Sequence, residues 1–177
     1  RLHDLKLDSL CKNFSSLKNY LNKMVKDCPN SYFNSGPRSS ALRFKLSDLK
    51  LIQIRGHEIS NLARYSLENN ENYNTGHSKV QTFMLEFDDK TIATEVPIYL
   101  TQNELDSYRE LFKSNEPLSG HIDILRVNDG KIWIWDFKPN AIREKYAATQ
   151  VYFYALMLSK RTNIDLDNFR CGYFDDD

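Results

Sequence analysis

The sequence predicts one domain of mixed α/β class, in which a small mixed sheet is flanked by helices and preceded by an N-terminal helical region. Its 177 residues suffice for a substantial core. A content of 41% hydrophobic and 27% charged residues is typical of a globular chain. Apolar residues recur every three or four positions early in the chain and at alternate positions later, so helices are expected before most strands.

The first expected helix covers residues 8–27, where apolar side chains lie three or four positions apart and Pro29 follows the last of them. Residues 29–44 are rich in Ser, Asn, Gly and Pro, which indicates a loop. Ser47 is placed as the N-cap of a second helix that is expected to reach Asn69.

The apolar period then changes to two, which predicts strands over 80–87 and 91–100 that form a hairpin turning near 88–90. Pro97 cannot donate a hydrogen bond to a neighbouring strand, so the second of these strands is expected at a sheet edge or at a bulge. Beyond the hairpin described next, the remaining expected elements are helices over 101–113 and 141–161 and a strand over 169–174.

The most informative segment contains two strands joined by the Asp-Gly pair at 129–130, a strong signal for a two-residue hairpin turn. With that turn, Asn128 pairs with Lys131, and counting back places Asp123 opposite Asp136. Directly opposed residues lie roughly 4.5–5.5 Å apart, where like charges are destabilising. A divalent cation between the two carboxylates would remove that repulsion, so the segment predicts a metal site.

Asp136 and Lys138 lie two positions apart and therefore point to the same side of their strand. Ordinary ion pairs of the two aspartates with Lys131, Lys138 or Arg126 are the simpler alternative. The apolar neighbours of both aspartates favour burial instead, and a buried charge needs a partner or a metal. The Asp-x-Lys tripeptide by itself is not informative, because it occurs at residues 4–6, 48–50, 88–90 and 136–138.

The helix expected after this strand contains Gln150 and Tyr154, which share a helix face with Arg143 because of their spacing. Such a pair is often no more than the polar edge of an amphipathic helix. Its position shortly after the Asp-x-Lys strand favours a role at the site instead.

Histidine is a common ligand of divalent metals, and His57, near the apolar stripe of the second helix, is the expected third ligand. His121 competes with it, because strand alternation puts His121 on the Asp123 face. His3 and His77 fall in segments expected to be flexible and are not expected at the site. Glu95 is a strand acid without an evident partner, and its role stays open.

The net charge of zero gives no general support for a nucleic-acid partner, although the charge is unevenly distributed. Residues 1–60 hold eleven Lys or Arg against five Asp or Glu, whereas residues 61–110 hold four against nine. The basic end is compatible with phosphate binding or with an ordinary solvated surface. Three widely spaced cysteines without a CxxC pair indicate buried thiols in a reducing compartment. With neither a secretory signal nor a membrane-length apolar run, a cytoplasmic protein without a membrane partner is expected.

Five short motifs together resemble the RecB-like branch of the PD-(D/E)XK nuclease superfamily. They occur in the order of that branch across residues 56–154, and the last three are the specific ones. The clustered four-cysteine arrangement of some relatives and a helicase motor are missing. The motifs are Gly56-His57, Glu95 with Pro97, Gly120 with Asp123, Asp136 with Lys138, and Gln150 with Tyr154.

The resemblance implies a restriction-endonuclease-like core over 45–177, with residues 1–44 forming an N-terminal helical region and loop of unknown role. It implies a Mg²⁺- or Mn²⁺-dependent deoxyribonuclease, either an exonuclease or a single-strand-active enzyme, of repair, recombination, mobile-element or defence processes. The implied substrate is DNA, with RNA as the alternative, and whether further domains or a protein partner take part stays open. The implied roles are metal binding by His57, Asp123, Asp136 and the Phe137 carbonyl, catalysis by Asp123, Asp136 and Lys138, substrate binding or support by Gln150, Tyr154 and Arg143, and an additional acid at Glu95.

Two alternatives remain open at this point. A nucleic-acid-binding or interaction module could keep the fold and lack catalysis, although the complete set of two acids and a lysine argues against it. A metal-dependent hydrolase acting on another phosphodiester is the second alternative.

Overall fold

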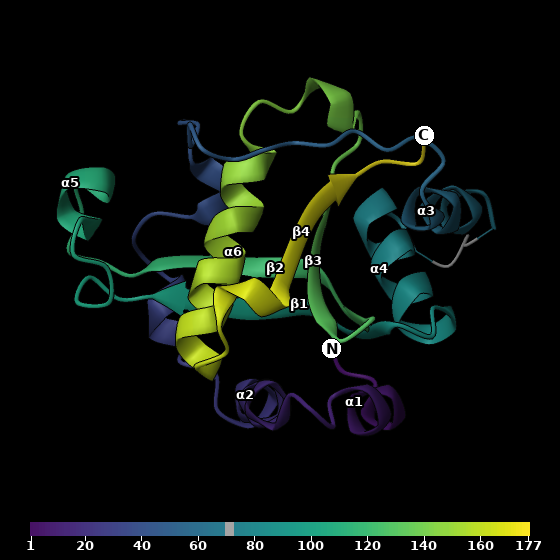
Figure 1. Ribbon diagram of the computed structural model, residues 1–177, viewed down its shortest axis with the longest axis horizontal. Helices are drawn as coiled ribbons and strands as arrows, with labels where there is room; N and C mark the ends of the chain where they lie inside the picture. Colours follow the sequence, from purple (N-terminus) through teal and green to yellow (C-terminus); the bar gives the residue numbers. More distant parts are fainter. Residues whose placement is uncertain (70–72) are drawn as a thin grey trace.

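The computed structural model describes residues 1–69 and 73–177 and confirms the mixed α/β class with a small sheet flanked by helices. The sheet has four strands in the order β1-β2-β3-β4; β1, β2 and β3 are antiparallel neighbours, and β4 is parallel to β3 (Figure 1). The strands are β1 (Thr91–Leu100), β2 (Leu118–Asn128), β3 (Lys131–Phe137) and β4 (Phe169–Phe174).

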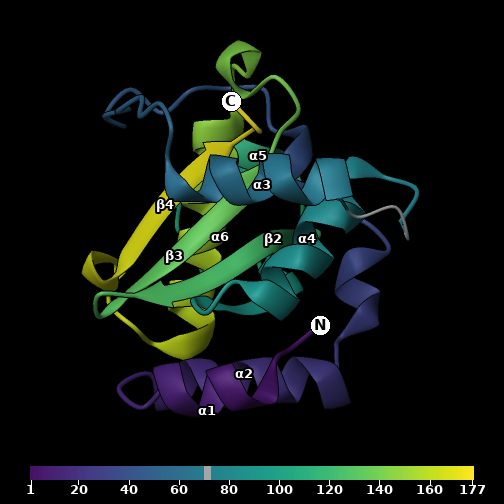
Figure 2. The same ribbon diagram turned by 90° about the vertical axis from the view of Figure 1, so that its right-hand side faces the viewer.

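Helices cover both faces of this sheet. Helix α6 packs along all four strands on one face, and α3 and α4 pack together on the other (Figure 2). Helices α1 and α2 lie against the edge strand β1. The helices are α1 (Asp4–Leu10), α2 (Ser15–Lys26), α3 (Glu58–Asn69), α4 (Gly76–Phe87), α5 (Tyr108–Phe112) and α6 (Ala147–Thr162), with 3₁₀ turns η1 (Asn30–Phe33), η2 (Ser39–Ala41), η3 (Ala141–Arg143) and η4 (Leu166–Asn168).

The side chains of β3 divide between two apolar cores. Ile132 and Ile134 are fully buried in the larger core, which includes α6, α2 and α1. Trp135 and Phe137 point to the opposite side and pack in a smaller core with residues of α3 and α4. This alternation is the two-residue period of a strand covered on both faces.

The segment 80–87, predicted as a strand, is helical and belongs to α4, so the predicted hairpin of 80–87 with 91–100 is wrong. Val80 and Met84 are fully buried one turn apart, which is a helical spacing. The helix begins after Thr75, whose side-chain oxygen accepts a hydrogen bond from the Ser78 N–H at 3.2 Å. Strand β1 pairs with β2 instead.

The second helix is shorter than predicted. It begins at Glu58 rather than near Ser47, and residues 47–57 are not helical. Within that segment Leu51 is exposed, so the hydrophobic residues there do not form a packed helix face. The actual start is set by His57, whose Nδ1 accepts the Ile59 N–H at 3.2 Å in the manner of an N-cap.

Three other predicted helices also differ from the structure. The helix over 8–27 is divided into α1 and α2, because the chain turns at 11–14 to bury Cys11 and Phe14 in the larger core. The helix over 101–113 shortens to α5. The helix over 141–161 begins at Ala147, and residues 141–143 form the separate turn η3.

The central hairpin is confirmed. Asn128 pairs with Lys131, and both turn residues, Asp129 and Gly130, have positive φ angles of 49° and 67°, as the tight hairpin turn requires. Pro97 lies in the edge strand as expected, and β4 has the predicted bounds.

The three cysteines are free, as expected. Cys11 is buried, but Cys28 is half-buried and Cys171 is exposed, so the expectation that all three are buried is wrong. Among the helices of the described residues, none has the length and apolar character to cross a membrane.

Candidate active site

Two buried aspartates lie at the end of the β2–β3 hairpin. The ladder is regular as far as the pair Ile124–Trp135, so Asp123 and Asp136 occupy the next position on each strand. Asp123 is 9% exposed and Asp136 only 1%. Burial raises the pKa of both carboxyls, and the nearby charge of Asp136 raises the pKa of Asp123 further. The pair therefore resists full ionisation.

Lys138 is the cation closest to this pair. Its Nζ lies 2.7 Å from Oδ2 of Asp136, and the attraction opposes part of the pKa rise that burial causes in Asp136. The backbone N–H of Lys138 donates to the carbonyl of Phe174 at 2.8 Å, which fixes the lysine at the point where β3 ends. The ammonium group is thus positioned by the sheet itself.

Helix α6 holds the other oxygen of Asp136. Gln150 Nε2 donates to Asp136 Oδ1 at 3.1 Å and to the Tyr154 hydroxyl at 2.8 Å. The Tyr154 ring in turn lies against Gly120, where an added Cβ would be 2.6 Å from a ring carbon. Gly120 therefore permits the close approach that lets α6 reach Asp136.

Helix α4 holds Asp123 in a similar way. Gln81 Nε2 donates to Asp123 Oδ1 at 3.3 Å and also to Oε1 of Glu95. The Phe137 N–H donates to Asp123 Oδ2 at 2.9 Å. Glu95 lies beside Asp123 on the neighbouring strand, since the residues that flank them are paired, and its φ of 52° marks a local distortion of β1. The structure thus brings Glu95 next to Asp123.

The histidine at this site is His77 rather than His57. His77 Nε2 is 3.7 Å from Asp123 Oδ2, and its ring packs edge-on against Phe137 with centroids 5.2 Å apart. His57 instead contacts Trp135, with ring centroids 5.2 Å apart, and no ion pair or hydrogen bond joins it to Asp123 or Asp136 in the described part of the chain.

The other two histidines are placed elsewhere. His121 lies on β2, where its Nδ1 is 3.5 Å from the Arg38 guanidinium, and burial lowers its pKa. His3 caps α1, with its Nδ1 accepting from the Lys6 N–H at 3.5 Å.

The expectation that His77 lies in a flexible segment away from the site is wrong, and Gln81 was missed; the two residues lie one helical turn apart on α4. Two signals could have found them: a second Gly-His pair at 76–77, and the four-residue spacing that puts both side chains on one helix face. The incorrect assignment of 80–87 to a strand concealed that face.

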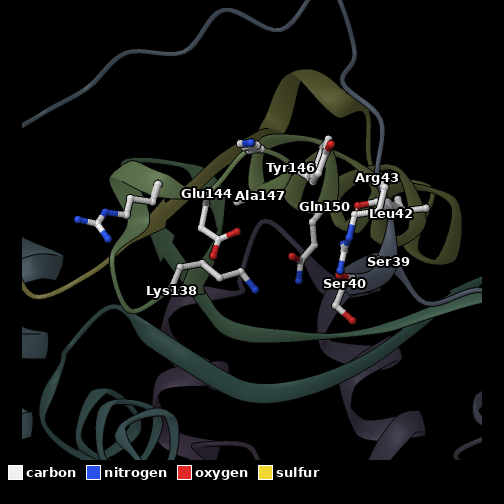
Figure 3. Close-up of a pocket in the computed structure, with 11 residues that line it drawn as sticks. Ser39, Ser40, Leu42, Arg43, Lys138, Glu144, Tyr146, Ala147 and Gln150 are labelled. Carbon is white, nitrogen blue, oxygen red and sulfur yellow. The ribbon is translucent and has the colours of Figure 1, made fainter.

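A cavity of about 420 Å³ opens beside Lys138 and Gln150. Figure 3 shows these two side chains directed toward a common gap, with Arg43 and Tyr146 on the far side of Gln150. Arg143 also lines the cavity but comes from η3, so it does not share a helix with Gln150 and Tyr154 as expected. The buried acids thus lie next to a space that a ligand can occupy.

The donor set has the chemistry that hard divalent ions prefer, namely carboxylate oxygens with an imidazole nearby. In the described residues no three His, Cys, Asp or Glu side chains are grouped to hold a metal ion as they stand. Gln81 occupies one oxygen of Asp123, and Lys138 and Gln150 occupy those of Asp136. A carboxylate oxygen has two lone pairs, so a cation could share the oxygens that Gln81 and Gln150 contact, whereas the Lys138 ammonium at Asp136 Oδ2 would have to move.

No protein-family model, curated protein or solved structure matches this chain. The function is therefore inferred from the geometry of the site and from the motifs in the sequence. Chemically, two buried acids of raised pKa beside a positioned lysine can bind a cation and orient a water against an anionic substrate.

Proposed function

We propose that this protein is a Mg²⁺- or Mn²⁺-dependent nuclease that hydrolyses phosphodiester bonds in DNA. The observation that carries the proposal is the position of the Lys138 ammonium, 2.7 Å from the buried Asp136 carboxylate, with the buried Asp123 beside it and an open cavity next to them. The motif order that resembles RecB-like nucleases supports the same reaction.

Asp123, Asp136 and the Phe137 carbonyl would hold the cation, and His77 replaces His57 as the candidate imidazole ligand because of its position near Asp123. A bound divalent ion would supply Lewis-acid stabilisation of the phosphate and lower the pKa of an attacking water. The hydrogen bonds of Gln81 and Phe137 to Asp123 keep that carboxylate oriented while it does so.

Lys138 has a separate role in the proposal. With a cation held by Asp136, the Lys138 ammonium would be free to contact the attacking water or the negative charge that develops on the phosphate. Gln150 and Tyr154 would hold Asp136 in place from α6 during this exchange. In the proposed reaction the water oxygen bonds to phosphorus, the bond from phosphorus to one strand oxygen breaks, and a proton of the water ends on the departing oxygen. Lys138 would stabilise the negative charge of the transition state electrostatically.

The test is cleavage of end-labelled linear DNA and closed circular DNA with Mg²⁺ or Mn²⁺. Asp136→Asn and Lys138→Ala should each abolish cleavage, while the matched control Lys131→Ala, at the opposite end of β3, should cleave like the unmodified protein. Melting temperatures confirm that the variants fold. Cleavage that persists in both site variants contradicts the proposal.

A second candidate is a nucleic-acid-binding module without catalysis. It is favoured by one observation, that the carboxylate oxygens are already engaged by Gln81, Lys138 and Gln150. This candidate predicts DNA binding that is unchanged by Mg²⁺ or Mn²⁺ and no hydrolysis under any metal condition.

A hydrolase of other phosphodiesters would instead cleave a small phosphodiester such as bis(p-nitrophenyl) phosphate but leave DNA intact.

A further inference from the structure

The cavity beside Lys138 is built by two segments far apart in the sequence. Residues 39–43, which the motif resemblance does not cover, form one side, and residues 143–147 with Gln150 form the other. Figure 3 shows Lys138 at one end of this space and Ser39, Ser40 and Arg43 at the other, with Gln150 between them. The cavity is thus continuous with the candidate active site.

The N-terminal segment is fixed in this position by hydrogen bonds. The Thr149 hydroxyl of α6 donates to the Phe44 carbonyl at 2.9 Å, and the Ser39 hydroxyl donates to the Ser119 carbonyl of β2 at 3.1 Å. Ser39 is itself buried. These hydrogen bonds hold the segment against α6 and β2, so it forms a fixed wall of the cavity.

The lining is strongly basic. Arg43, Arg143 and Lys145 join Lys138 there, against the single acid Glu144. Within residues 1–69 and 73–177, neither Arg143 nor Lys145 forms an ion pair. Uncompensated positive charge around a concave surface attracts phosphate groups, and the uncapped first turn of α6 adds backbone N–H donors to it.

One wall of the cavity is also suited to a planar ring. Tyr146 is half-buried, and the Arg43 guanidinium lies 5.8 Å from the centre of its ring. Arg43 is held there by its hydrogen bonds to the carbonyls of Leu42 at 2.9 Å and Ser40 at 3.1 Å. Aromatic and guanidinium planes are the surfaces on which nucleobases stack.

We infer that this cavity is a subsite for one nucleotide of the substrate strand next to the phosphate that is cleaved. Arg143 and Lys145 bind its phosphate, and Tyr146 with Arg43 receives its base. The inference rests on the proposed function for the cleavage step, but not for the binding of the nucleotide. A volume of about 420 Å³ matches a single small ligand and not a base-paired duplex. The N-terminal segment thereby gains a role in substrate recognition.

The first experiment measures binding without cleavage. A fluorescein-labelled oligothymidylate is titrated with protein in Ca²⁺, and its dissociation constant is followed by anisotropy. Tyr146→Ala should weaken binding roughly 5- to 150-fold, as expected for the loss of one base stack, while Tyr146→Phe should bind like the unmodified protein. Thymidine 5′-monophosphate should compete for the site more strongly than thymidine or inorganic phosphate.

Charge is tested separately with Lys145→Gln, matched by Lys26→Gln on the distant helix α2. The first variant should reduce the slope of log affinity against log salt by about 0.7, the value expected for one lost contact to a single strand. The control should leave both affinity and slope unchanged. Equal affinity for Tyr146→Ala, Lys145→Gln and the unmodified protein overturns the inference.

A cleavage assay on the same oligonucleotide separates this inference from the proposed function. If the unmodified protein cleaves and the two subsite variants cleave with the same KM, the subsite is wrong and the nuclease proposal stands. If no protein cleaves but the subsite variants lose binding, the nuclease proposal is wrong and the nucleotide subsite stands. The expected result is a raised KM in both variants with kcat largely retained.

Discussion

Asp123→Asn should make the metal-free protein more stable while it removes metal binding. The carboxyl of Asp123 is 9% exposed and lies beside Asp136, and its pKa is raised above the ordinary value of 3.8 mainly by burial and then by the charge of Asp136. Ionised Asp123 therefore lowers the free energy of unfolding at neutral pH. Asparagine keeps the shape and can still accept the hydrogen bond that the Phe137 N–H donates to Asp123.

The magnitude follows from two opposing contributions. Each unit of raised pKa that the substitution removes is worth about 1.4 kcal/mol. The new amide group faces the Gln81 donor, so one hydrogen bond worth about 1 kcal/mol is lost. With roughly two to three units relieved, the net gain is on the order of 2–3 kcal/mol. For a domain of this size, that raises Tm by about 2–4 °C per kcal/mol.

The assay is thermal unfolding in EDTA between pH 5 and pH 8, with Asp89→Asn as an exposed control. Because the folded-state pKa of Asp123 lies above its unfolded value, the stability associated with its protonated form is present below about pH 4 and is lost as the pH rises through the folded-state pKa. The advantage of Asp123→Asn should therefore grow with pH. A variant that melts below the unmodified protein at pH 8 would refute the interpretation of the acid pair.

Three further predictions concern the other site residues. His77→Ala should weaken Mn²⁺ binding about 10- to 100-fold by calorimetry, whereas His57→Ala should leave Mn²⁺ binding unchanged and only reduce stability by removing the N-cap of α3. Gly120→Ala should lower the free energy of unfolding by about 1–3 kcal/mol and reduce kcat, because its Cβ displaces the Tyr154 ring; equal melting and activity would contradict that contact. Mn²⁺ at 100 times its Kd should stabilise the protein by about 2.7 kcal/mol, and its Kd should fall as the pH rises because the acids must lose their proton; a pH-independent Kd would exclude them as ligands.

The parts of the site that the sequence predicted correctly depend on local rules. The turn at 129–130 sets the register of the hairpin, and from the register the adjacent positions of Asp123 and Asp136 follow by counting. The two-residue spacing of Asp136 and Lys138 likewise puts them on one side of the strand, and the structure joins them in the ion pair that the sequence analysis ranked below a metal site. In each case the determining residues lie within a few positions of one another along the chain.

The parts that were wrong or missed depend on packing between distant segments. The sequence 80–87 contains both strand-like alternation and the helical spacing of Val80 and Met84. Of the two conformations, only the helix buries Val80 and Met84 together in the smaller core. The position of His77 beside Asp123 follows from how α4 docks on the sheet, which the Gly-His pair at 76–77 and the four-residue spacing to Gln81 suggest but do not specify. His57 was the plausible choice from its Gly-His motif, and its packing on Trp135 could not be read from that motif.

The two aspartates are held from opposite sides of the sheet by the same kind of hydrogen bond, from a glutamine amide to a carboxylate oxygen. Gln150 of α6 donates to Asp136, and Gln81 of α4 donates to Asp123, while the sheet register alone brings the two acids together. A glutamine amide is neutral, so it orients a carboxylate without neutralising its charge, and Lys138 offsets only one of the two negative charges when both acids are ionised. A lysine or arginine at both positions would satisfy the acids and remove the attraction for a cation. The arrangement therefore favours a site that remains incomplete until a cation binds over a purely structural cluster of ion pairs.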